Sequence, residues 1–442
     1  MRPTWRLRPG PYLAPAAAVG LPLALLGADG IVGAGLALGL DALLMLIGWR
    51  EGRGAAHWPL LVEREIDARL VLGVPSRVRV RVHNRAARPV RVAIRDAPPP
   101  GFEASVPELR VELPPHARRE LEYTVIPPRR GRWRFGDLEA RVDGPWRLGA
   151  AVLTVPSSVE ARVYPDVLGA HRRALSARLR ELSLLGVRPV RVAGGGGEIE
   201  QLREYVAGDP YRDIDWKATA RRARPVTRQY SQERAQQVML CVDAGRLMAM
   251  RMDDGRTRLD HAVRAALLLA FVALRRGDRV GLVVFSDVVH TWVAPGRGPG
   301  QYRRLLEALF AVEAQTTGVD FRRLVEVLRA RLRRRALVVV FSDLLDESQA
   351  RPLAEHAGAL RPKHLALCVS LHDPQVDALA LAPAEDEAAV YRRAAAADLL
   401  AERAQVRAML SARAVELVEA TSDELAVATV NRYLEIKARH RL

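Results

Sequence analysis

The sequence predicts a multi-domain protein with an N-terminal transmembrane helical hairpin, an antiparallel β-sandwich and a C-terminal, doubly wound α/β domain. Two apolar segments open the chain, short segments of alternating hydrophobicity follow, and continuous apolar runs then alternate with amphipathic helices. A chain of 442 residues also exceeds the size at which one hydrophobic core keeps growing, so several domains are expected. The expected parts are the hairpin (1–55), the sandwich (56–168), a linker (169–235) and the α/β domain (236–442).

The hairpin is predicted from two nearly uncharged segments, residues 11–28 and 31–49, which Asp29 and Gly30 separate. At ~1.5 Å of rise per residue each helix reaches about 27 Å, marginally enough for a hydrocarbon core of about 30 Å. Basic residues flank the pair and the turn carries none, so the positive-inside rule places both termini and the soluble domains in the cytoplasm, at the inner membrane. The flanking residues are Arg2, Arg6, Arg8, Arg50 and Arg53.

Two features of this region leave alternatives open. A basic start before an apolar run also describes a cleaved signal peptide, although the second apolar segment follows at once and favours the hairpin. Asp41 interrupts the second segment, and a carboxylate inside a membrane is protonated, paired across a helix interface or hydrated.

The formal net charge of +17 comes from arginines scattered among acidic residues. No helix-turn-helix, zinc-finger or RNA-binding motif accompanies them, so no specific nucleic-acid partner is expected. A basic surface facing an anionic membrane leaflet accounts for the charge, and so does general arginine richness. Cys241 and Cys368 lie in apolar runs, which predicts buried thiols and excludes a disulfide framework.

The sandwich is predicted from a period of two between residues 60 and 166, where Val78, Val80 and Val82 alternate with arginines. Further short strands are expected between proline-rich turns. About seven strands in about 100 residues indicate an antiparallel sandwich of immunoglobulin-like type. No active-site motif lies within this region.

Residues 203–222, called the signature below, combine acids, bases, Gly, Pro, Tyr and Trp in one short run. Gly208, Asp209 and Pro210 predict a turn, because Gly tolerates positive φ and Pro fixes φ. Charged residues then alternate with apolar ones, which predicts a partly buried network whose charges need partners. The prediction depends on Arg203, Tyr205, Gly208, Asp209, Arg212, Asp213, Asp215, Trp216, Thr219 and Arg221.

The signature, continued by Pro225, Val226, Arg228 and Glu233, resembles the core motif of the bacterial domain-of-unknown-function 58 family. In that family the motif joins an N-terminal β-domain to a von Willebrand factor A-like domain, and the parts of this chain come in the same order over residues 1–442. The resemblance implies no catalytic activity and no cofactor. It implies a membrane-tethered partner of a MoxR-type AAA+ ATPase, with related von Willebrand factor A-like proteins as further candidate partners.

Two interpretations of the signature stay open. In one, its arginines brace its aspartates while Trp216 fills a domain junction; in the other, the same residues form a contact surface for a partner. The brace is favoured, because ion-pair networks pack structural cores as readily as functional sites. A hydrolase built on Asp209, Asp213 and Asp215 is a third hypothesis, which lacks a nucleophile and a metal-ligand set of known spacing.

The α/β domain is predicted from continuous Val/Leu runs, such as residues 238–242 and 336–341, that alternate with amphipathic helices. Such runs indicate strands covered on both faces, and hence a doubly wound, mainly parallel sheet. Its ligand crevice is expected at the carboxyl ends of the strands.

The resemblance implies a metal-ion-dependent adhesion site in this crevice, built from an Asp-x-Ser-x-Ser turn, a Thr and a second Asp. The corresponding positions hold Asp243, Gly245, Leu247, Val319 and Asp343. Both aspartates are kept, but the two serines and the threonine are replaced. Mg²⁺ requires about six oxygen ligands in near-octahedral geometry, so a degenerate, metal-free site is expected. The carboxylates are then expected to bond backbone amides or Arg246.

The expected function is that of a non-enzymatic, membrane-anchored scaffold or adaptor, since neither an HExxH nor a GxSxG motif occurs. It would present the von Willebrand factor A-like domain to a partner. The expected contact surface consists of loops near Asp243, Ser286, Gly318 and Asp343. The alternative is a divalent-metal-dependent receptor that binds a partner carboxylate through Asp243 and Asp343, with calcium or manganese also held by Asp346 and waters.

Overall fold

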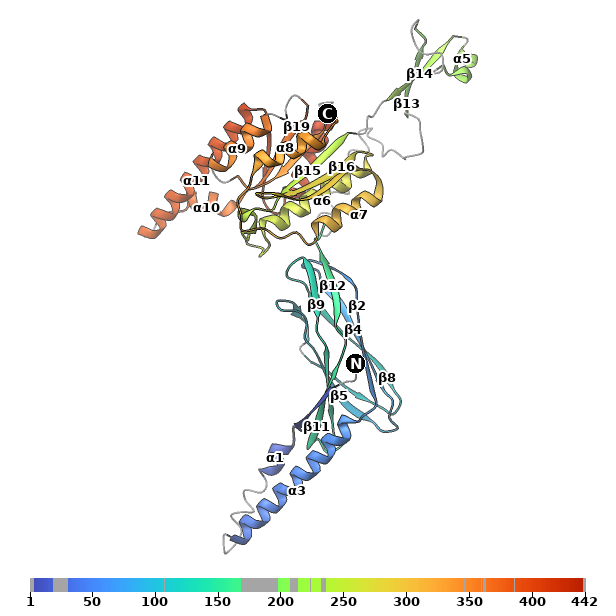
Figure 1. Ribbon diagram of the computed structural model, residues 1–442, viewed down its shortest axis with the longest axis vertical. Helices are drawn as coiled ribbons and strands as arrows, with labels where there is room; N and C mark the ends of the chain where they lie inside the picture. The colour runs from blue at the N-terminus through green and yellow to red at the C-terminus, as the bar shows by residue number, and fades with distance from the viewer. Residues whose placement is uncertain are drawn as a thin grey trace. The chain divides into compact units, whose positions relative to one another are not determined.

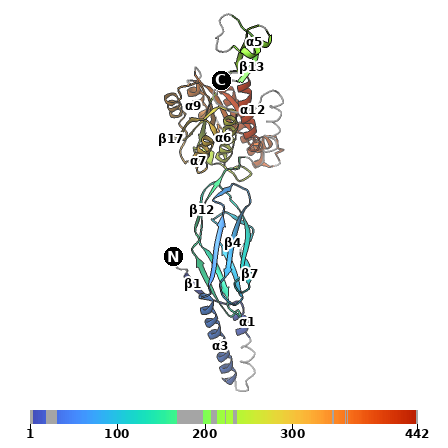
Figure 2. The same ribbon diagram turned by 90° about the vertical axis from the view of Figure 1, so that its right-hand side faces the viewer.

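The computed structural model describes residues 4–18, 31–106, 108–167, 198–206, 214–222, 224–231, 236–344, 347–358, 360, 363–384 and 386–439. The chain divides into two compact units, Met1–Asp166 and Val167–Leu442. Figures 1 and 2 show a β-rich first unit that carries a long helix, and a second unit with helices on both faces of a sheet.

The first unit contains three sheets that share one hydrophobic core. Their strand orders are β1-β11-β10-β5-β7, β2-β4-β8-β6 and β3-β12-β9. The strands are β1 (Thr4–Pro9), β2 (Leu60–Ile66), β3 (Arg69–Val71), β4 (Ser76–Asn84), β5 (Val90–Asp96), β6 (Glu103–Ala104), β7 (Leu109–Leu113), β8 (Arg118–Ile126), β9 (Gly131–Phe135), β10 (Leu138–Asp143), β11 (Gly149–Val155) and β12 (Val159–Tyr164). Their pairings are antiparallel except for β3 with β12. The predicted alternation is confirmed on β4, where Val78, Val80 and Val82 are buried.

Residues 4–9 form a strand, although their arginines predict only a basic flank of an apolar segment. β1 pairs antiparallel with β11, and Pro9 lies opposite Gly149. Trp5 and Leu7 alternate with arginines, which is the period of a strand, and both side chains are exposed in the structure. This part of the chain therefore belongs to a sheet of the first unit.

One long apolar helix, α3 (Ile31–Ala56), stands where the second span of the hairpin is predicted. In the described part of the chain, Val32–Ala56 is the one helix that is long and apolar enough to cross a membrane. The predicted first span, residues 11–28, contains the five-residue helix α1 (Leu13–Ala17), too short to span, and residues 19–30 lie outside the described residues. The prediction of two spanning helices is therefore corrected to one long apolar helix.

Helix α3 extends beyond the predicted apolar segment because its last turns pack on the sandwich. Gly48 lies so close to β11 that a Cβ added at Gly149 would sit 1.8 Å from the Gly48 carbonyl oxygen. The carboxylate of Glu51 accepts hydrogen bonds from three backbone N–H groups of the β10–β11 turn. Their donors are Trp146 at 2.6 Å, Leu148 at 2.9 Å and Gly149 at 3.0 Å. The polar end of the helix thus holds a turn of the sandwich.

The second unit confirms the predicted α/β sheet. Its six strands have the order β17-β16-β15-β18-β19-β20, and neighbours are parallel except β16 with β17. The strands are β15 (Gln237–Asp243), β16 (Arg279–Phe285), β17 (Val289–Gly296), β18 (Leu337–Phe341), β19 (Leu365–Leu371) and β20 (Glu416–Ala420). The helices are α6 (Arg258–Arg275), α7 (Gly298–Leu309), α8 (Phe321–Arg331), α9 (Glu347–Gly358), α10 (Pro374–Leu381), α11 (Glu387–Ala412) and α12 (Leu425–Ala438).

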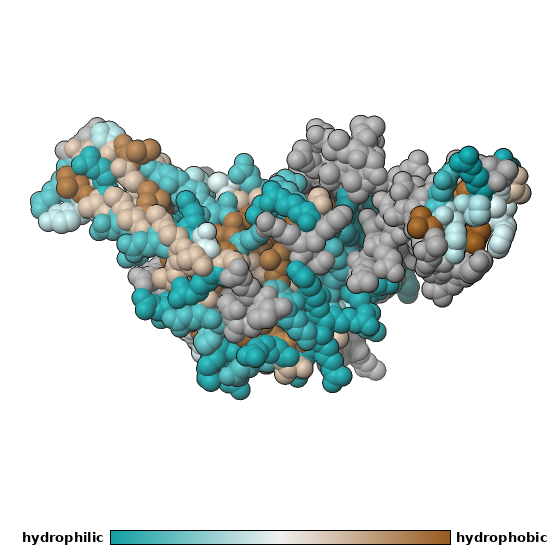
Figure 3. All heavy atoms as spheres, turned by 90° about the horizontal axis from the view of Figure 1, so that it is seen from above, coloured by the Kyte–Doolittle hydropathy of each residue, from teal (hydrophilic) through white to brown (hydrophobic). Residues whose placement is uncertain are grey.

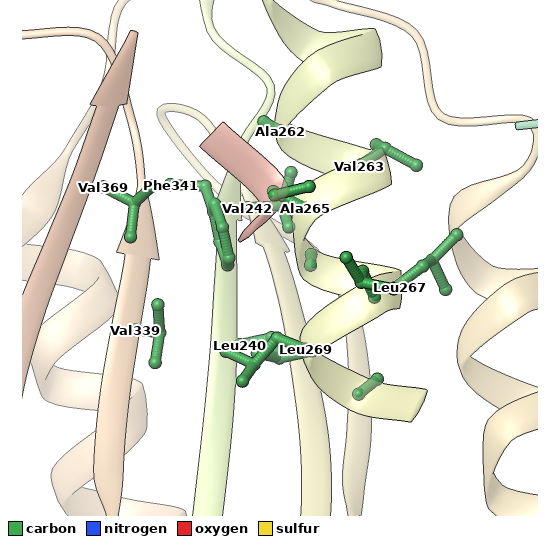
Figure 4. Packing of buried hydrophobic residues seen from close by; sticks show 14 of the residues in the cluster. Leu240, Val242, Ala262, Val263, Ala265, Leu267, Leu269, Val339, Phe341 and Val369 are labelled. Carbon is green, nitrogen blue, oxygen red and sulfur yellow. The ribbon is translucent and has the colours of Figure 1, made fainter. Parts of the chain in front are cut away.

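Strand β15 shows how a continuous apolar run fits between two layers of helices. Val238, Leu240 and Val242 belong to the core cluster that includes α6, whereas Met239 and Cys241 belong to the cluster on the opposite face. Figure 4 shows Leu240 and Val242 beside the apolar face of α6. Both cysteines are buried free thiols, as the sequence predicts.

Candidate functional site

The carboxyl ends of the central strands bring polar side chains from several loops to one edge of the sheet. We call these residues the strand-end cluster: Asp243, Ser286, Ser342, Asp343 and Ser370, together with Arg258 from the start of α6. Each of these six residues is at most 6% exposed. Buried polar groups need partners, so the hydrogen bonds of the cluster decide what it can bind.

Asp243 uses both carboxylate oxygens within the fold. Its Oδ1 accepts a hydrogen bond from the backbone N–H of Gly245 at 2.6 Å, and its Oδ2 accepts one from the Ser342 hydroxyl at 2.6 Å. Burial raises the pKa of Asp243 to about 6, although these two hydrogen bonds act in the opposite direction. The predicted bond to a backbone amide is confirmed.

Gly245 and Val319 depart from the adhesion-site motif together. A Cβ added at Gly245 would lie 2.7 Å from Cγ2 of Val319 and 3.0 Å from Oδ1 of Asp243. The valine side chain therefore occupies the space that a serine at position 245 needs. Leu247 lies half-buried in a 3-10 turn, Arg246–Ala249. No hydroxyl ligand of the motif is present at any of these three positions.

Asp343 forms an ion pair with Arg258, and the two side chains are 1% and 6% exposed. The sequence predicts Arg246, not Arg258, as the arginine partner of the carboxylates. The Ser370 hydroxyl donates to the other Asp343 oxygen, Oδ1, at 3.3 Å. Burial, followed by the nearby charge of Arg403, lowers the pKa of Arg258. A fixed cation of the protein thus neutralises the second carboxylate of the motif.

The start of α6 holds Arg258 in place. The Thr257 hydroxyl accepts from the Asp260 backbone N–H at 3.1 Å, and the Asp260 carboxylate accepts from the Thr257 backbone N–H at 2.9 Å. This capping box fixes the first turn, with Arg258 as the first helical residue. The Thr257 and Asp260 spacing in the sequence is typical of such a cap. The residues next to Arg258 in the sequence, however, do not show that it pairs with Asp343.

A second polar group ties the loop around residue 317 to the β16–β17 turn. The Ser286 hydroxyl lies 2.7 Å from Asp287 Oδ1 and 2.8 Å from His290 Nε2, and the Thr317 hydroxyl donates to Asp287 at 2.9 Å. The hydrogen bonds from Ser286 and Thr317 lower the pKa of Asp287. A serine–histidine–aspartate relay requires the carboxylate to orient the imidazole. Here the carboxylate bonds the two hydroxyls, so the arrangement does not supply that chemistry.

A third group fastens α10 and α11 to the end of β19. His372 Nδ1 lies 3.1 Å from Nη1 of the buried Arg403, and His372 Nε2 lies 2.5 Å from Asp377 Oδ2. Because the Arg403 guanidinium can only donate, His372 Nδ1 accepts its hydrogen bond. His372 Nε2 then carries the hydrogen and donates a hydrogen bond to the Asp377 carboxylate. The two helices are therefore anchored at the carboxyl edge of the sheet.

Metal ligands are not assembled in the described residues. There, no group of three or more His, Cys, Asp or Glu side chains is placed to hold a metal ion. Asp346, named in the alternative ligand set, lies outside the described residues. The oxygens of Asp243 and Asp343 already accept hydrogen bonds or face Arg258, so a cation here has to displace internal partners.

The described part of the signature forms a small separate sheet and one short helix. β13 (Glu198–Glu204) pairs antiparallel with β14 (Val226–Ser231), and Arg203 lies opposite Thr227. Asp215 accepts from the backbone N–H groups of Lys217 and Ala218 at 3.1 and 3.0 Å, which caps α5 (Trp216–Arg222). The Thr219 hydroxyl accepts from the Val226 backbone N–H at 3.0 Å.

Trp216 is 67% exposed, so the prediction that it fills a domain junction is wrong. It is the first residue of α5, directly after the Asp215 cap. Tyr205 donates its backbone N–H to Pro225 at 2.9 Å, and the Arg221 side chain is exposed. Gly208, Asp209, Arg212 and Asp213 lie outside the described residues, and the predicted brace among them is not described.

Residues 201–417 match the family described as protein of unknown function DUF58. Uncharacterized proteins of Mycobacterium bovis and Mycobacterium tuberculosis are 28% identical over 244 residues, which cover 54% of this chain and 69% of each relative.

Two solved structures are similar at low TM-scores. The conserved hypothetical protein BatB from Bacteroides thetaiotaomicron is 14% identical with a TM-score of 0.33, over 47% of this chain and 100% of that one. The CARDB domain of the PF1109 protein from Pyrococcus furiosus is 17% identical with a TM-score of 0.17, over 24% of this chain and 90% of that one.

The family match is narrower than the predicted resemblance over residues 1–442 and includes the signature, the strand-end cluster and most of the α/β sheet. Residues 201–417 of this chain belong to the DUF58 family.

Proposed function

We propose that the protein is a non-enzymatic, membrane-anchored adaptor whose von Willebrand factor A-like domain binds a partner protein. The family resemblance suggests a MoxR-type AAA+ ATPase as that partner. The observation that carries the proposal is the Arg258–Asp343 ion pair, because it occupies the crevice where α/β folds of this kind hold ligands. With its carboxylates engaged internally, this edge offers a fixed shape.

Helix α3 supports the anchor. Its exposed apolar residues are Val32, Leu36, Leu38, Leu43, Met45 and Leu46, each between 53% and 70% exposed. From Val32 to Trp49 the helix rises about 27 Å at ~1.5 Å per residue, close to the thickness of a hydrocarbon core. Asp41 is half-buried within it, and its Oδ1 has no hydrogen-bond partner among the described residues. A soluble protein would have no reason to expose so continuous an apolar helix.

Aromatic residues mark where the helix leaves the membrane. Tyr12, Trp49 and Trp146 are between 49% and 68% exposed and lie around the β10–β11 turn that Glu51 holds. Arg147 stacks on Tyr12 with its guanidinium carbon 4.5 Å from the ring centroid. Exposed Trp and Tyr beside Arg are typical of the membrane–water interface, so this turn is proposed to lie there.

Pairing of β1 with β11 supports one topology. Because the two strands share a sheet, residues 4–9 and the sandwich lie on the same side of the bilayer in which α3 is proposed to be anchored. A cleaved signal peptide would remove β1 from this sheet, so the pairing favours a retained N-terminus. With the positive-inside rule, both units are proposed to be cytoplasmic.

The partner surface is proposed at the outer end of the α10–α11 pair. Leu379, Leu381, Val390 and Tyr391 are 41%, 86%, 48% and 68% exposed. Figure 3 shows exposed hydrophobic side chains gathered at this end of the domain. Both helices follow β19, so this surface projects from the predicted contact edge. The matched family segment, residues 201–417, includes both helices. Exposed apolar clusters of this kind mark protein contacts.

Co-purification tests the proposal. The detergent-solubilised full chain is immobilised and exposed to the MoxR-type ATPase of the same organism, and the retained ATPase is quantified. We expect retention by the wild type and at least tenfold less by the Leu381→Glu/Tyr391→Glu variant. Gln405→Glu adds a negative charge at an exposed site of α11, the helix that carries Tyr391, and this variant is expected to retain the ATPase as the wild type does. Failure of the wild type to retain the ATPase would count against this partner.

A further inference from the structure

A cavity of about 710 Å³ lies between α3 and the sandwich, inside the first unit. This volume falls within the roughly 300–1,000 Å³ of small-molecule sites. Its apolar wall is formed by Ile47, Ala55, Trp58, Val90, Pro145 and Trp146. The Trp58 indole N–H donates to Asn84 at 3.1 Å, so the ring adds apolar surface without an unmet donor.

The acidic side chains at this cavity already have partners. Glu51 accepts the three backbone hydrogen bonds of the β10–β11 turn. Glu112 pairs with Arg91 at 3.3 Å, and Asp143 pairs with Arg141 at 3.0 Å. None of these carboxylates is left to bind a cationic ligand.

Two arginines at the cavity have no such partner among the described residues. Arg50 comes from α3 and Arg88 from the segment before β5, and both are exposed. Neither side chain makes a hydrogen bond or ion pair to another described residue. An anion held between them would give both guanidinium groups a partner.

The cavity also lies next to the apolar surface of the anchor. Ile47 belongs both to its wall and to the apolar part of α3, and Trp146 belongs both to its wall and to the proposed interfacial aromatics. An acyl chain lying along α3 therefore reaches Trp58 and Val90 without crossing water.

We propose that this cavity binds one anionic phospholipid, with the phosphate between Arg50 and Arg88 and part of an acyl chain against Trp58 and Val90. The proposal rests on membrane anchoring by α3. The apolar wall favours a lipid over a free phosphate compound, and the two arginines, which have no partner among the described residues, favour an anionic over a neutral headgroup. The site gives the sandwich a specific lipid contact beyond the anchor itself.

Native mass spectrometry of the detergent-solubilised full chain tests the site, with phosphatidylglycerol as the probe and phosphatidylcholine as the neutral comparison. We expect one phosphatidylglycerol to be retained in preference to phosphatidylcholine. Each arginine near an anionic lipid contributes about a factor of five, so Arg50→Gln/Arg88→Gln should bind roughly 25-fold more weakly. Arg77→Gln/Arg129→Gln removes two exposed arginines that do not line the cavity and should bind as the wild type does.

A cavity-filling variant guards against misfolding as an explanation. Gly54 lines the cavity, and a Cβ added there meets nothing within 4 Å. Gly54→Leu should exclude the lipid while keeping or raising the thermal stability, since Gly is a poor helix former. Gly39→Leu, also on α3 with open space around its Cβ, should leave lipid retention unchanged.

The outcomes separate the anchor from the site. A wild type that floats with phosphatidylcholine vesicles but shows no preference for phosphatidylglycerol would leave the anchor intact and overturn the lipid site. Stabilisation by inorganic phosphate to the same degree as by the lipid would assign the site to a soluble phosphate compound and overturn it as well. A chain that floats with no vesicle would overturn both proposals.

Discussion

The guanidinium of Arg258 and the carboxylate of Asp343 form a buried ion pair at the carboxyl ends of the central strands, where their side chains are 6% and 1% exposed. This pair joins the start of α6 to the end of β18. Burial decides the role of this pair in stability. A single buried charge without its partner lowers the free energy of unfolding by more than the intact pair raises it.

Arg258→Ala should destabilise the α/β unit by about 3–5 kcal/mol, because it leaves the Asp343 carboxylate buried without its cation. Arg258→Met/Asp343→Leu removes both charges and should restore most of this loss. Thermal unfolding of the detergent-solubilised chain measures both effects. A single variant as stable as the wild type would show that Asp343 has no need of the arginine.

Gly245→Ala should destabilise the unit by about 1–3 kcal/mol, because the new methyl group meets Cγ2 of Val319. In a Val319→Ala background the same change should cost much less, giving a coupling energy of about 0.5–3 kcal/mol in a double-mutant cycle. If the two substitutions changed the free energy of urea unfolding additively, the proposed steric conflict between position 245 and Val319 would be contradicted.

Titration calorimetry with magnesium, calcium and manganese should show no saturable binding in the wild type, and the same trace in Asp243→Ala. The reason is that the Asp243 oxygens accept from Gly245 and Ser342 while Asp343 faces Arg258. Saturable binding that disappears in Asp243→Ala would instead support the metal-dependent receptor.

Asp243 should make stability depend on pH. Its pKa is about 6 in the folded state against an ordinary 3.8, so the folded state binds the proton more tightly. Stability from this group is therefore fully present below about pH 4, falls as the pH rises to about 6, and then levels off. Relative to Asp243→Asn, the wild type should lose on the order of 2–3 kcal/mol across this window. Parallel stability curves for the two proteins would contradict the raised pKa.

Glu51→Ala should release the β10–β11 turn from α3. The amides of Trp146, Leu148 and Gly149 lose their acceptor, so their hydrogen exchange should become at least tenfold faster. Glu63→Ala, on the sandwich strand β2, provides a control that should leave these amides unchanged. Unchanged exchange in Glu51→Ala would show that the glycine contacts alone hold the turn.

Much of the fold was accessible from the sequence because burial leaves a periodic record. Alternation at Val78, Val80 and Val82 predicts a half-buried strand, and the unbroken run at residues 238–242 predicts one covered on both faces. Strand β1 is not predicted although Trp5 and Leu7 show the same alternation, because the arginines between them also fit the basic flank of a membrane segment.

The site was predicted only in part. The motif positions Asp243 and Asp343 do lie at the strand ends, and Gly245 was recognised as a departure. The partner of Asp343 could not be predicted, since Arg258 reaches it from the start of another element and carries no local mark of that contact. The same limit applies to Trp216, whose exposure depends on how the capped helix is oriented.

Pairing of β1 with β11 also constrains how the protein is made. The ribosome delivers residues 4–9 first and their partner strand only after α3 and most of the sandwich have been synthesised. Until β11 has been synthesised, β1 remains an unpaired strand. An unpaired strand can pair with the wrong partner. The sheet therefore gains its first strand only after residues 149–155 have left the ribosome.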